Sequence, residues 1–237
     1  MRKFPEPVFT SQGVYFALDG KKLFNEKTWL DALTFHEPGL APVKDESGWY
    51  HINLNGLPVY KQRYKRTFGY YENRAAVIDW ENNWFHIDTK GNRIYNENYN
   101  WVGNFQKGRC PVRDKNGKYF HICPDGTRCY QEYYLYAGDY NEGIAAVQTK
   151  EGLFMHIDEE GNPVHKGKYL FLGQYHKHFA IARDKKGWFH IDLKGRPVYP
   201  HRYDYVEPFY NGHALARDLE GQYLIIDEKG NKVKCLS

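Results

Sequence analysis

The chain has few of the features that mark membrane, secreted or nucleic-acid-binding proteins. No apolar run approaches the length of about 20 residues that a membrane helix needs. The amino-terminal segment MRKFPEPVFTSQ contains no apolar core of the kind found in signal peptides. The 33 basic and 29 acidic residues leave a net charge of only +4, and no segment gathers the basic ones. We therefore expect a soluble, cytoplasmic protein that binds neither nucleic acid nor membranes.

The sequence also has few signs of redox, metal or cofactor chemistry. Its four cysteines form no CxxC pair, so we expect a reducing compartment without a structural disulfide. We find no nucleophile elbow, phosphate-binding loop or metal-ligand spacing. Apart from a weak candidate around residues 26–33, no segment of useful length has the period of an amphipathic helix. The sequence therefore implies no cofactor and no metal, and it gives little support for an enzyme.

A repeat of about 35 residues is what the sequence does contain. A His-Ile segment, followed by Asp or Asn in four copies and by Cys123 in the other, recurs at steps of 35, 35, 35 and 34 residues, at His51, His86, His121, His156 and His190. A second series keeps the same step, at Tyr64, Tyr99, Tyr134, Tyr169 and Tyr203. Two series of residues with the same spacing indicate that one supersecondary unit is repeated along the chain.

Each repeat is interpreted as four short strands. A small apolar strand is followed by an aromatic-rich strand that carries the histidine. The motif Asp-x-x-Gly then predicts a type I turn whose glycine has positive φ, as at Asp88–Gly91. The aromatic fraction of 17%, with 21 tyrosines, is typical of many half-exposed strands.

The repeats predict one all-β domain over residues 1–237. Their approximate bounds are 7–40, 41–74, 75–109, 110–144, 145–179 and 180–213, with a partial copy at 214–237. The two end copies lack the histidine and have Ala17 and Ile225 in its place. About six units of four meandering strands favour a six-bladed β-propeller. A solenoid of stacked β-hairpins is the alternative.

The motifs resemble one known family. An aromatic residue before His-Ile-Asp-x-x-Gly, a following Pro-Val and a downstream Phe-x-x-Gly-x-Ala are similar to the bacterial WG (KWG) repeat. Five segments carry this likeness further, toward a repeat module found ahead of some bacterial S-adenosylmethionine-dependent methyltransferase domains: FHEPGLAPV at 35–43, FGYYENRAAV at 68–77, GNFQKGRC at 103–110, DYNEGIAAV at 139–147 and EPFYNGHA at 207–214. The resemblance implies a binding or scaffolding module, with a separate enzyme among the partners to expect. It does not imply methyl transfer, because no glycine-rich cofactor loop follows the last strand.

The five repeated histidines have two interpretations. Arranged at equal steps, they could bind a metal or an anion around an axis. The favoured interpretation is structural, because a residue present in every unit usually makes the same hydrogen bond in every unit. They also lack the close sequence pairing of zinc ligands.

Candidate binding residues lie where the repeats differ, in the turn before each first strand. If the units close into a ring, these turns share one face, and their side chains suit a polar or anionic ligand. Asn73 and His178 replace a glycine there, which predicts positive φ at both. The candidates are Glu37, Tyr71, Arg74, Gln106, Arg109, Asn141, His176, His178, Tyr210 and His213.

Three functions are compatible with this pattern. The favoured one is a non-catalytic module that binds a small polar or anionic molecule or a peptide at these turns. The second is an enzyme that uses Glu37, His176 or His213 as the base and Tyr71 or Tyr210 as the proton donor. The third is a protein-interaction scaffold that uses the many tyrosines and tryptophans.

Overall fold

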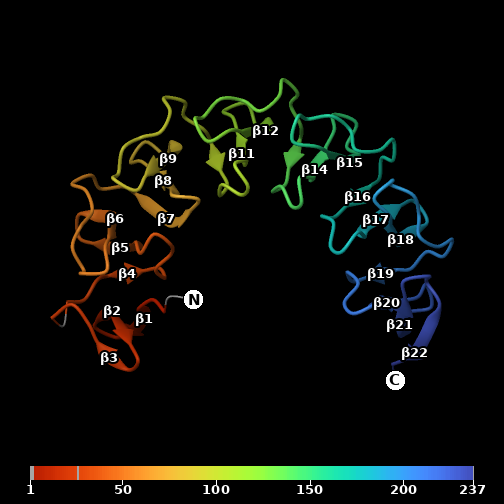
Figure 1. Cartoon of the computed structure of the whole chain (residues 1–237), viewed down its shortest axis with the longest axis horizontal. Coiled ribbons are helices and arrows are strands. Elements are labelled where there is room, and N and C mark those ends of the chain that lie inside the picture. Colours follow the sequence, from red (N-terminus) through yellow and green to blue (C-terminus); the bar gives the residue numbers. More distant parts are fainter. Residues whose placement is uncertain (1–2, 26, 237) are drawn as a thin grey trace. The chain divides into compact units, whose positions relative to one another are not determined.

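The computed structural model describes residues 3–25 and 27–236, and all of its regular structure is β-strand. Across these residues no helix is long and apolar enough to cross a membrane. Twenty-two strands, most of them labelled in Figure 1, form seven small sheets in the described ranges. Each strand is only two to six residues long, and many of the turns between strands contain a glycine with positive φ.

Every sheet is an antiparallel meander whose strands follow chain order. The early sheets are β1(Glu6–Thr10)–β2(Gly13–Leu18)–β3(Lys21–Lys22), β4(Asp31–Ala32)–β5(Ala41–Asp45)–β6(Gly48–Ile52) and β7(Arg66–Tyr71)–β8(Arg74–Ile78)–β9(Trp84–Asp88). The next is β10(Trp101–Val102)–β11(Cys110–Arg113)–β12(Tyr119–Ile122). The later sheets are β13(Tyr136–Ala137)–β14(Ala145–Gln148)–β15(Phe154–Ile157), β16(Phe171–Leu172)–β17(Ala180–Asp184)–β18(Gly187–Ile191) and β19(Tyr205–Val206)–β20(His213–Arg217)–β21(Tyr223–Asp227)–β22(Lys232–Cys235).

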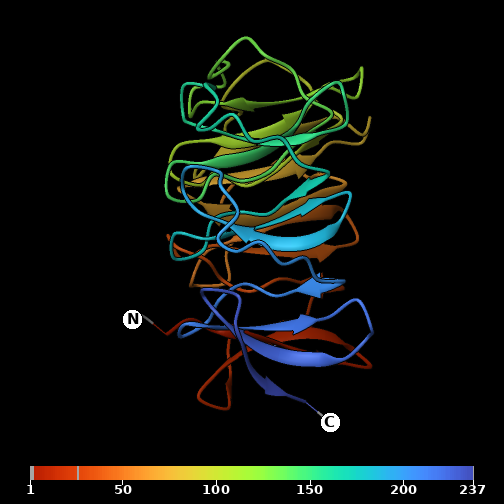
Figure 2. The same ribbon diagram turned by 90° about the vertical axis from the view of Figure 1, so that its right-hand side faces the viewer.

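The fold class predicted from the repeats is confirmed. The protein is all-β, and its successive small meander sheets correspond to the blades of a propeller-like repeat fold. The end copies also form sheets. The first has three strands, and the last, blue in Figure 2, has four. The structure therefore contains seven such sheets in its described residues, where the sequence suggested six units and a partial copy.

Each sheet is offset from the sequence repeat. The short strand that ends one repeat pairs with the first strand of the next, as in Trp101 opposite Arg113 and Val102 opposite Val112. The chain divides into two compact units, the first running to Gly117 with Ile122–Thr127 and the second containing Lys118–His121 and the chain from Arg128 onward.

Buried isoleucines contribute to the core of each unit. Six of them follow the repeat step, and all have no exposed surface: Ile52, Ile87, Ile122, Ile157, Ile191 and Ile226. Burying one such side chain contributes roughly 1.5–3 kcal/mol. Because the strand period is two, the residue before each of them, where the histidines stand, faces the opposite side of the strand.

The Asp-x-x-Gly turns form as predicted. Oδ1 of Asp88 accepts hydrogen bonds from the amides of Lys90 and Asn92, and Gly91 has φ +85°. The ring of Tyr60, one repeat earlier, lies against Gly91 so closely that a Cβ atom there would come within 2.4 Å of it. The turn therefore also joins neighbouring repeats. Position 91 requires glycine because its φ is positive and because the ring of Tyr60 leaves no space for a Cβ atom.

The first copy corrects the sequence register. Val14 forms a bridge with Trp29, as Trp49 does with Tyr64 in the second copy. The position of the histidine is therefore Phe16, and not Ala17. Phe16 is fully buried. The contracted turn after this strand shifted the alignment by one residue.

Candidate functional site

All five repeated histidines are buried and make the same two hydrogen bonds. Nε2 bonds a backbone carbonyl 17 residues later, and Nδ1 bonds a side chain nine residues later, at 2.5–3.0 Å. Because the carbonyl can only accept, Nε2 carries the proton and Nδ1 accepts. The partners at Nδ1 are Tyr60, Tyr95, Tyr130, His165 and Tyr199.

This hydrogen bonding supports the structural interpretation of the histidines. Burial lowers the pKa of His51, a representative case, to about 4, so the ring is neutral at neutral pH. Both ring nitrogens are occupied within the fold. In the described part of the chain, no group of three or more His, Cys, Asp or Glu side chains could hold a metal ion.

The variable turns before the first strands have the predicted backbone. Asn73 has φ +62° and His178 has φ +74°, where the corresponding turns use glycine, such as Gly143 at +79°. The preceding residues, for example Lys177 at +48°, also have positive φ. Two successive residues of this kind are typical of a type I′ turn, which suits the twist of a hairpin.

One predicted binding residue is out of register. In the first copy the bridge that closes the turn joins His36 to Leu40, whereas later copies join residues three apart, such as His176 and Phe179. The extra residue places His36, and not Glu37, at the position equivalent to Tyr71 and His176. Glu37 is exposed in the turn. It does not line either of the two clefts formed beside these turns.

In the first unit, the predicted residue Tyr71 lines a cleft. The cleft has a volume of about 390 Å³, and the ring of His36 lies 5.0 Å from the ring of Tyr71 in it. The guanidinium of Arg74 donates to the carbonyls of Glu72 and Pro124. It is therefore engaged within the fold instead of facing a ligand.

Gln106 and Arg109, the other two predicted residues of this unit, form the bridge of their own turn. Nη1 of Arg109 donates to the carbonyl of Gly108 at 3.1 Å. Gln106 is exposed and Arg109 is half-buried. Neither residue lines the cleft that contains Tyr71.

In the second unit, three predicted residues come together. Asn141, His176 and Tyr210, at equivalent turn positions of three successive repeats, line a cleft of about 350 Å³. The rings of His176 and Tyr210 are 5.0 Å apart. Asn141 donates from Nδ2 to the carbonyl of Tyr175 at 3.0 Å, which fixes its side chain in the cleft wall.

The cleft of the second unit offers an unused polar atom. Nε2 of His176 is buried and has no hydrogen-bond partner among the described residues. A buried donor or acceptor without a partner is costly, at roughly 1–3 kcal/mol. A polar group bound in the cleft would relieve this cost.

The two remaining predicted residues lie outside this cleft. His178 is exposed in the tip of its turn. His213 is exposed as well, and its Nδ1 donates to the carbonyl of Asn211 at 3.0 Å. Both are separated from the cleft because the side chains of a tight turn point in different directions.

A larger cavity lies in the second unit, lined by residues that the sequence pattern did not predict as binding residues. It has a volume of about 880 Å³ and lies between the segment 131–135, the turn 149–151 and the segment 161–163, which follows β15. Met155 lines it in place of the aromatic residue found at the equivalent position of four other repeats. This replacement of an aromatic residue by methionine was the feature of the sequence that could have indicated the cavity.

Comparison with known structures shows a likeness of fold. The computationally designed Ika8 protein has a TM-score of 0.51 and 10% identity, over 100% of this chain and 85% of its own. BamB from Moraxella catarrhalis has a TM-score of 0.49 and 10% identity, over 85% and 72% of the two chains. The C-terminal WD40 domain of Sif2 has a TM-score of 0.46 and 13% identity, over 90% and 69%.

Comparison of sequences identifies the repeat. No curated protein matches the chain. Two segments, 84–119 and 188–223, match the family described as the WG containing repeat. Each begins at the tryptophan two residues before a buried histidine, Trp84 or Trp188, and includes the Asp-x-x-Gly turn. The resemblance to the WG repeat inferred from the motifs is thereby confirmed for these two segments of the chain.

Proposed function

We propose that the protein is a non-catalytic binding module that recognises a polar small molecule or a peptide in the cleft formed by Asn141, His176 and Tyr210. A propeller-like repeat fold suits such a role, because its regular strands hold dissimilar turn residues at fixed spacing. The observation that carries the proposal is the buried Nε2 of His176, which has no partner among the described residues.

The cleft provides both polarity and apolar contact area. His176 can accept from a neutral ligand or, when protonated, donate to an anionic one. The ring of Tyr210 is 60% exposed and forms a wall beside it. The proposal does not depend on Arg74, whose guanidinium is engaged with backbone carbonyls.

Substitution of His176 and Tyr210 tests the proposal. Acetate, inorganic phosphate and acetylated dipeptide amides are screened by saturation-transfer NMR, and compounds that bind the wild type are retested on His176→Ala and Tyr210→Ala. We expect binding to fall at least about tenfold in both variants. Tyr210 is exposed, so its variant should keep the stability within the roughly 0.5 kcal/mol usual for surface changes.

His178→Ala is the matched control, since it removes an imidazole two residues away that does not line the cleft. It should bind the probes like the wild type. Binding that survives both cleft substitutions, or that is lost equally in His178→Ala, contradicts the proposal.

A protein-interaction surface is a second candidate, favoured by a stripe of aromatic rings in the second unit. Successive rings lie 5.0–6.1 Å apart along Tyr119, Tyr136, Phe154, Phe171 and Trp188. Tyr136 is 46% exposed and Phe171 is 38% exposed. Exposed aromatic residues are frequent in the centres of protein interfaces. Replacing Tyr136 by serine should reduce capture of a partner protein without changing the small-molecule screen, because Tyr136 does not line the cleft of Asn141, His176 and Tyr210. Unchanged capture argues against this surface.

A further inference from the structure

An arginine covers the strand that carries the histidine in four of the five central repeats. Its guanidinium stacks on the aromatic side chain that precedes the repeated histidine, with 3.6–4.7 Å between the guanidinium carbon and the ring centroid. The pairs are Arg63 on Tyr50, Arg93 on Phe85, Arg128 on Phe120 and Arg202 on Phe189. The same guanidinium groups donate to backbone carbonyls nearby. The arginine is therefore a regular part of the repeat.

The covering arginine comes from one of two sequence positions. It stands either seven residues after the histidine, as in Arg93 and Arg128, or twelve residues after it, as in Arg63 and Arg202. The seventh position is proline whenever the twelfth is arginine. Each of these four strands is thus covered by one guanidinium, whether the arginine stands at the seventh or at the twelfth position after the histidine.

The repeat of His156 has neither arginine. Pro163 occupies the seventh position and Lys168 the twelfth, and the aromatic residue under the guanidinium is replaced by Met155. The acid that ends the first strand of the other central repeats, such as Asp184, is replaced by Thr149. In the next repeat that acid bonds the covering arginine, with Nε of Arg202 2.9 Å from Oδ2 of Asp184.

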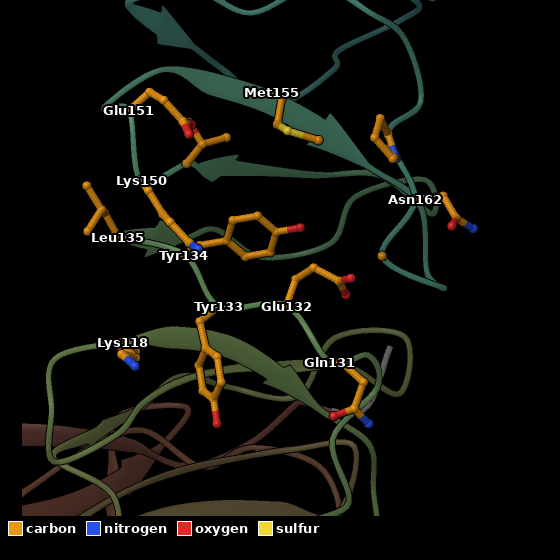
Figure 3. A pocket seen from close by; sticks show the side chains of 13 residues that line it. Lys118, Gln131, Glu132, Tyr133, Tyr134, Leu135, Lys150, Glu151, Met155 and Asn162 are labelled. Atoms are coloured by element: carbon orange, nitrogen blue, oxygen red, sulfur yellow. The ribbon is translucent and has the colours of Figure 1, made fainter.

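The cavity of about 880 Å³ lies where this arginine is missing. Tyr134, Met155 and Pro163 line it, as Figure 3 shows for the two labelled residues Tyr134 and Met155. The residues equivalent to Tyr134 and Met155 one repeat later are Tyr169 and Phe189, whose rings are 5.6 Å apart. Arg202 fills the corresponding place there, since it lies 3.6 Å from the centroid of Phe189.

The lining of the cavity suits a planar cation. The ring of Tyr134, the thioether of Met155 and the ring of Pro163 offer flat or adaptable apolar surfaces to the faces of a guanidinium. The carboxylates of Glu132 and Glu151 also line the cavity, on different segments (Figure 3). Burial and the charge of Glu132 raise the pKa of Tyr134 to about 12, so the negative charge reaches the cavity wall. Two lysines line it as well, and Nζ of Lys118 lies 5.0 Å from the centroid of Tyr133.

We propose that this cavity binds the side chain of an arginine presented by a partner peptide or protein, which takes the place that an internal arginine fills in the neighbouring repeats. The partner's guanidinium stacks on Met155 beside Tyr134, as Arg202 stacks on Phe189 beside Tyr169, and its N–H groups donate to Glu132 or Glu151. This site is separate from the cleft of Asn141, His176 and Tyr210, and either can fail without the other.

Met155 provides a reporter at the site. The chain has only two methionines, Met1 and Met155, so ¹³C-methyl-methionine labelling gives one signal from the cavity. The labelled protein is titrated with acetyl-Gly-Arg-Gly-amide and with matched peptides that carry citrulline, lysine or glutamate instead of arginine. We expect a saturable shift of the Met155 methyl signal with the arginine peptide. The citrulline peptide, which has the same shape without the charge, should bind with an affinity at least about tenfold lower. Equal binding of the citrulline or glutamate peptide, or no saturable shift with arginine, overturns the proposal.

Pro163→Arg fills the cavity from within while keeping Met155 as the reporter. Arg93 and Arg128 stand at the equivalent position and show that the repeat accepts an arginine there. We expect this variant to lose the peptide-induced shift. The matched control is Pro197→Arg, the same change in the next repeat, where Arg202 already covers Phe189; it should bind the arginine peptide normally. Lys168→Arg supplies the guanidinium by the other route and serves if Pro163→Arg does not fold. Wild-type binding in a folded Pro163→Arg or Lys168→Arg protein contradicts the site.

Discussion

At the scale of single residues, the repeat specifies hydrogen bonds more strictly than it specifies side-chain types. A histidine and a tyrosine nine residues apart bond each other in four repeats, and in the fifth His165 takes the place of the tyrosine. The first copy has an apolar version, because Phe16 packs edge-on against Phe24 with 5.9 Å between ring centroids. Either a complete polar pair or a complete apolar pair satisfies the buried position.

A double-mutant cycle on His86 and Tyr95 tests this rule. His86→Phe leaves the hydroxyl of Tyr95 and the carbonyl of Gly103 without their partner, so we expect a loss of about 2–4 kcal/mol in the free energy of unfolding. Adding Tyr95→Phe should cost less than it does in the wild-type background, because one unsatisfied group is removed. Urea denaturation of the four proteins measures the coupling. Additive losses would show that the pair does not act as a unit.

At the scale of elements, the Asp-x-x-Gly turn both reverses the chain and packs against an aromatic ring of the preceding repeat, as Gly91 does against Tyr60. Two glycines of the first unit separate these effects. Gly91 and Gly117 have similar φ values, +85° and +78°. A Cβ at Gly91 would lie 2.4 Å from the ring of Tyr60, whereas nothing lies within 4 Å at Gly117.

Alanine at these two glycines should therefore have unequal effects. Gly117→Ala carries only the cost of left-handed backbone, about 1–2 kcal/mol. Gly91→Ala carries the same cost and must also displace Tyr60, so we expect it to lose about 1–3 kcal/mol more. Thermal or urea unfolding of both variants measures the difference. A Gly91→Ala protein no less stable than Gly117→Ala would mean that Tyr60 moves aside without cost.

At the scale of the whole molecule, the buried histidines make stability depend on pH. Burial lowers the pKa of four of them to about 4, from an ordinary value of 6.5: His51, His86, His156 and His190. Above pH 6.5 these groups are neutral in both the folded and the unfolded chain and have no effect. As the pH falls from 6.5 toward 4, the unfolded chain binds protons that the folded chain does not, and the folded state loses stability.

The expected loss is large because it is repeated. One unit of pKa corresponds to about 1.4 kcal/mol, so each histidine accounts for roughly 3 kcal/mol and the four for on the order of 10 kcal/mol, comparable with the stability of a whole domain. Urea midpoints measured between pH 7.5 and 4 should fall steeply over this window. The double variant His86→Phe/Tyr95→Phe should show a shallower fall, and His213→Ala, which removes an exposed imidazole, should not. A flat profile down to pH 4.5 would mean that these rings are not buried in the neutral form.

The periodic features of the chain were determined by the sequence alone. Equal steps of His-Ile-Asp and of tyrosine predicted an all-β repeat fold, the Asp-x-x-Gly turns and the positive φ of Asn73 and His178. These follow from local rules, since strand alternation and turn chemistry depend on residues a few positions apart.

Tertiary structure decided the features that depend on register between strands and on packing between repeats. It placed His36 instead of Glu37 at the turn position and gathered Asn141, His176 and Tyr210 in one cleft. It also showed that the missing arginine around Met155 leaves a cavity. A one-residue insertion changes which side chain faces a neighbour, and two sequence positions can supply the same guanidinium. Such outcomes arise where separate segments meet in space, so no single segment contains them.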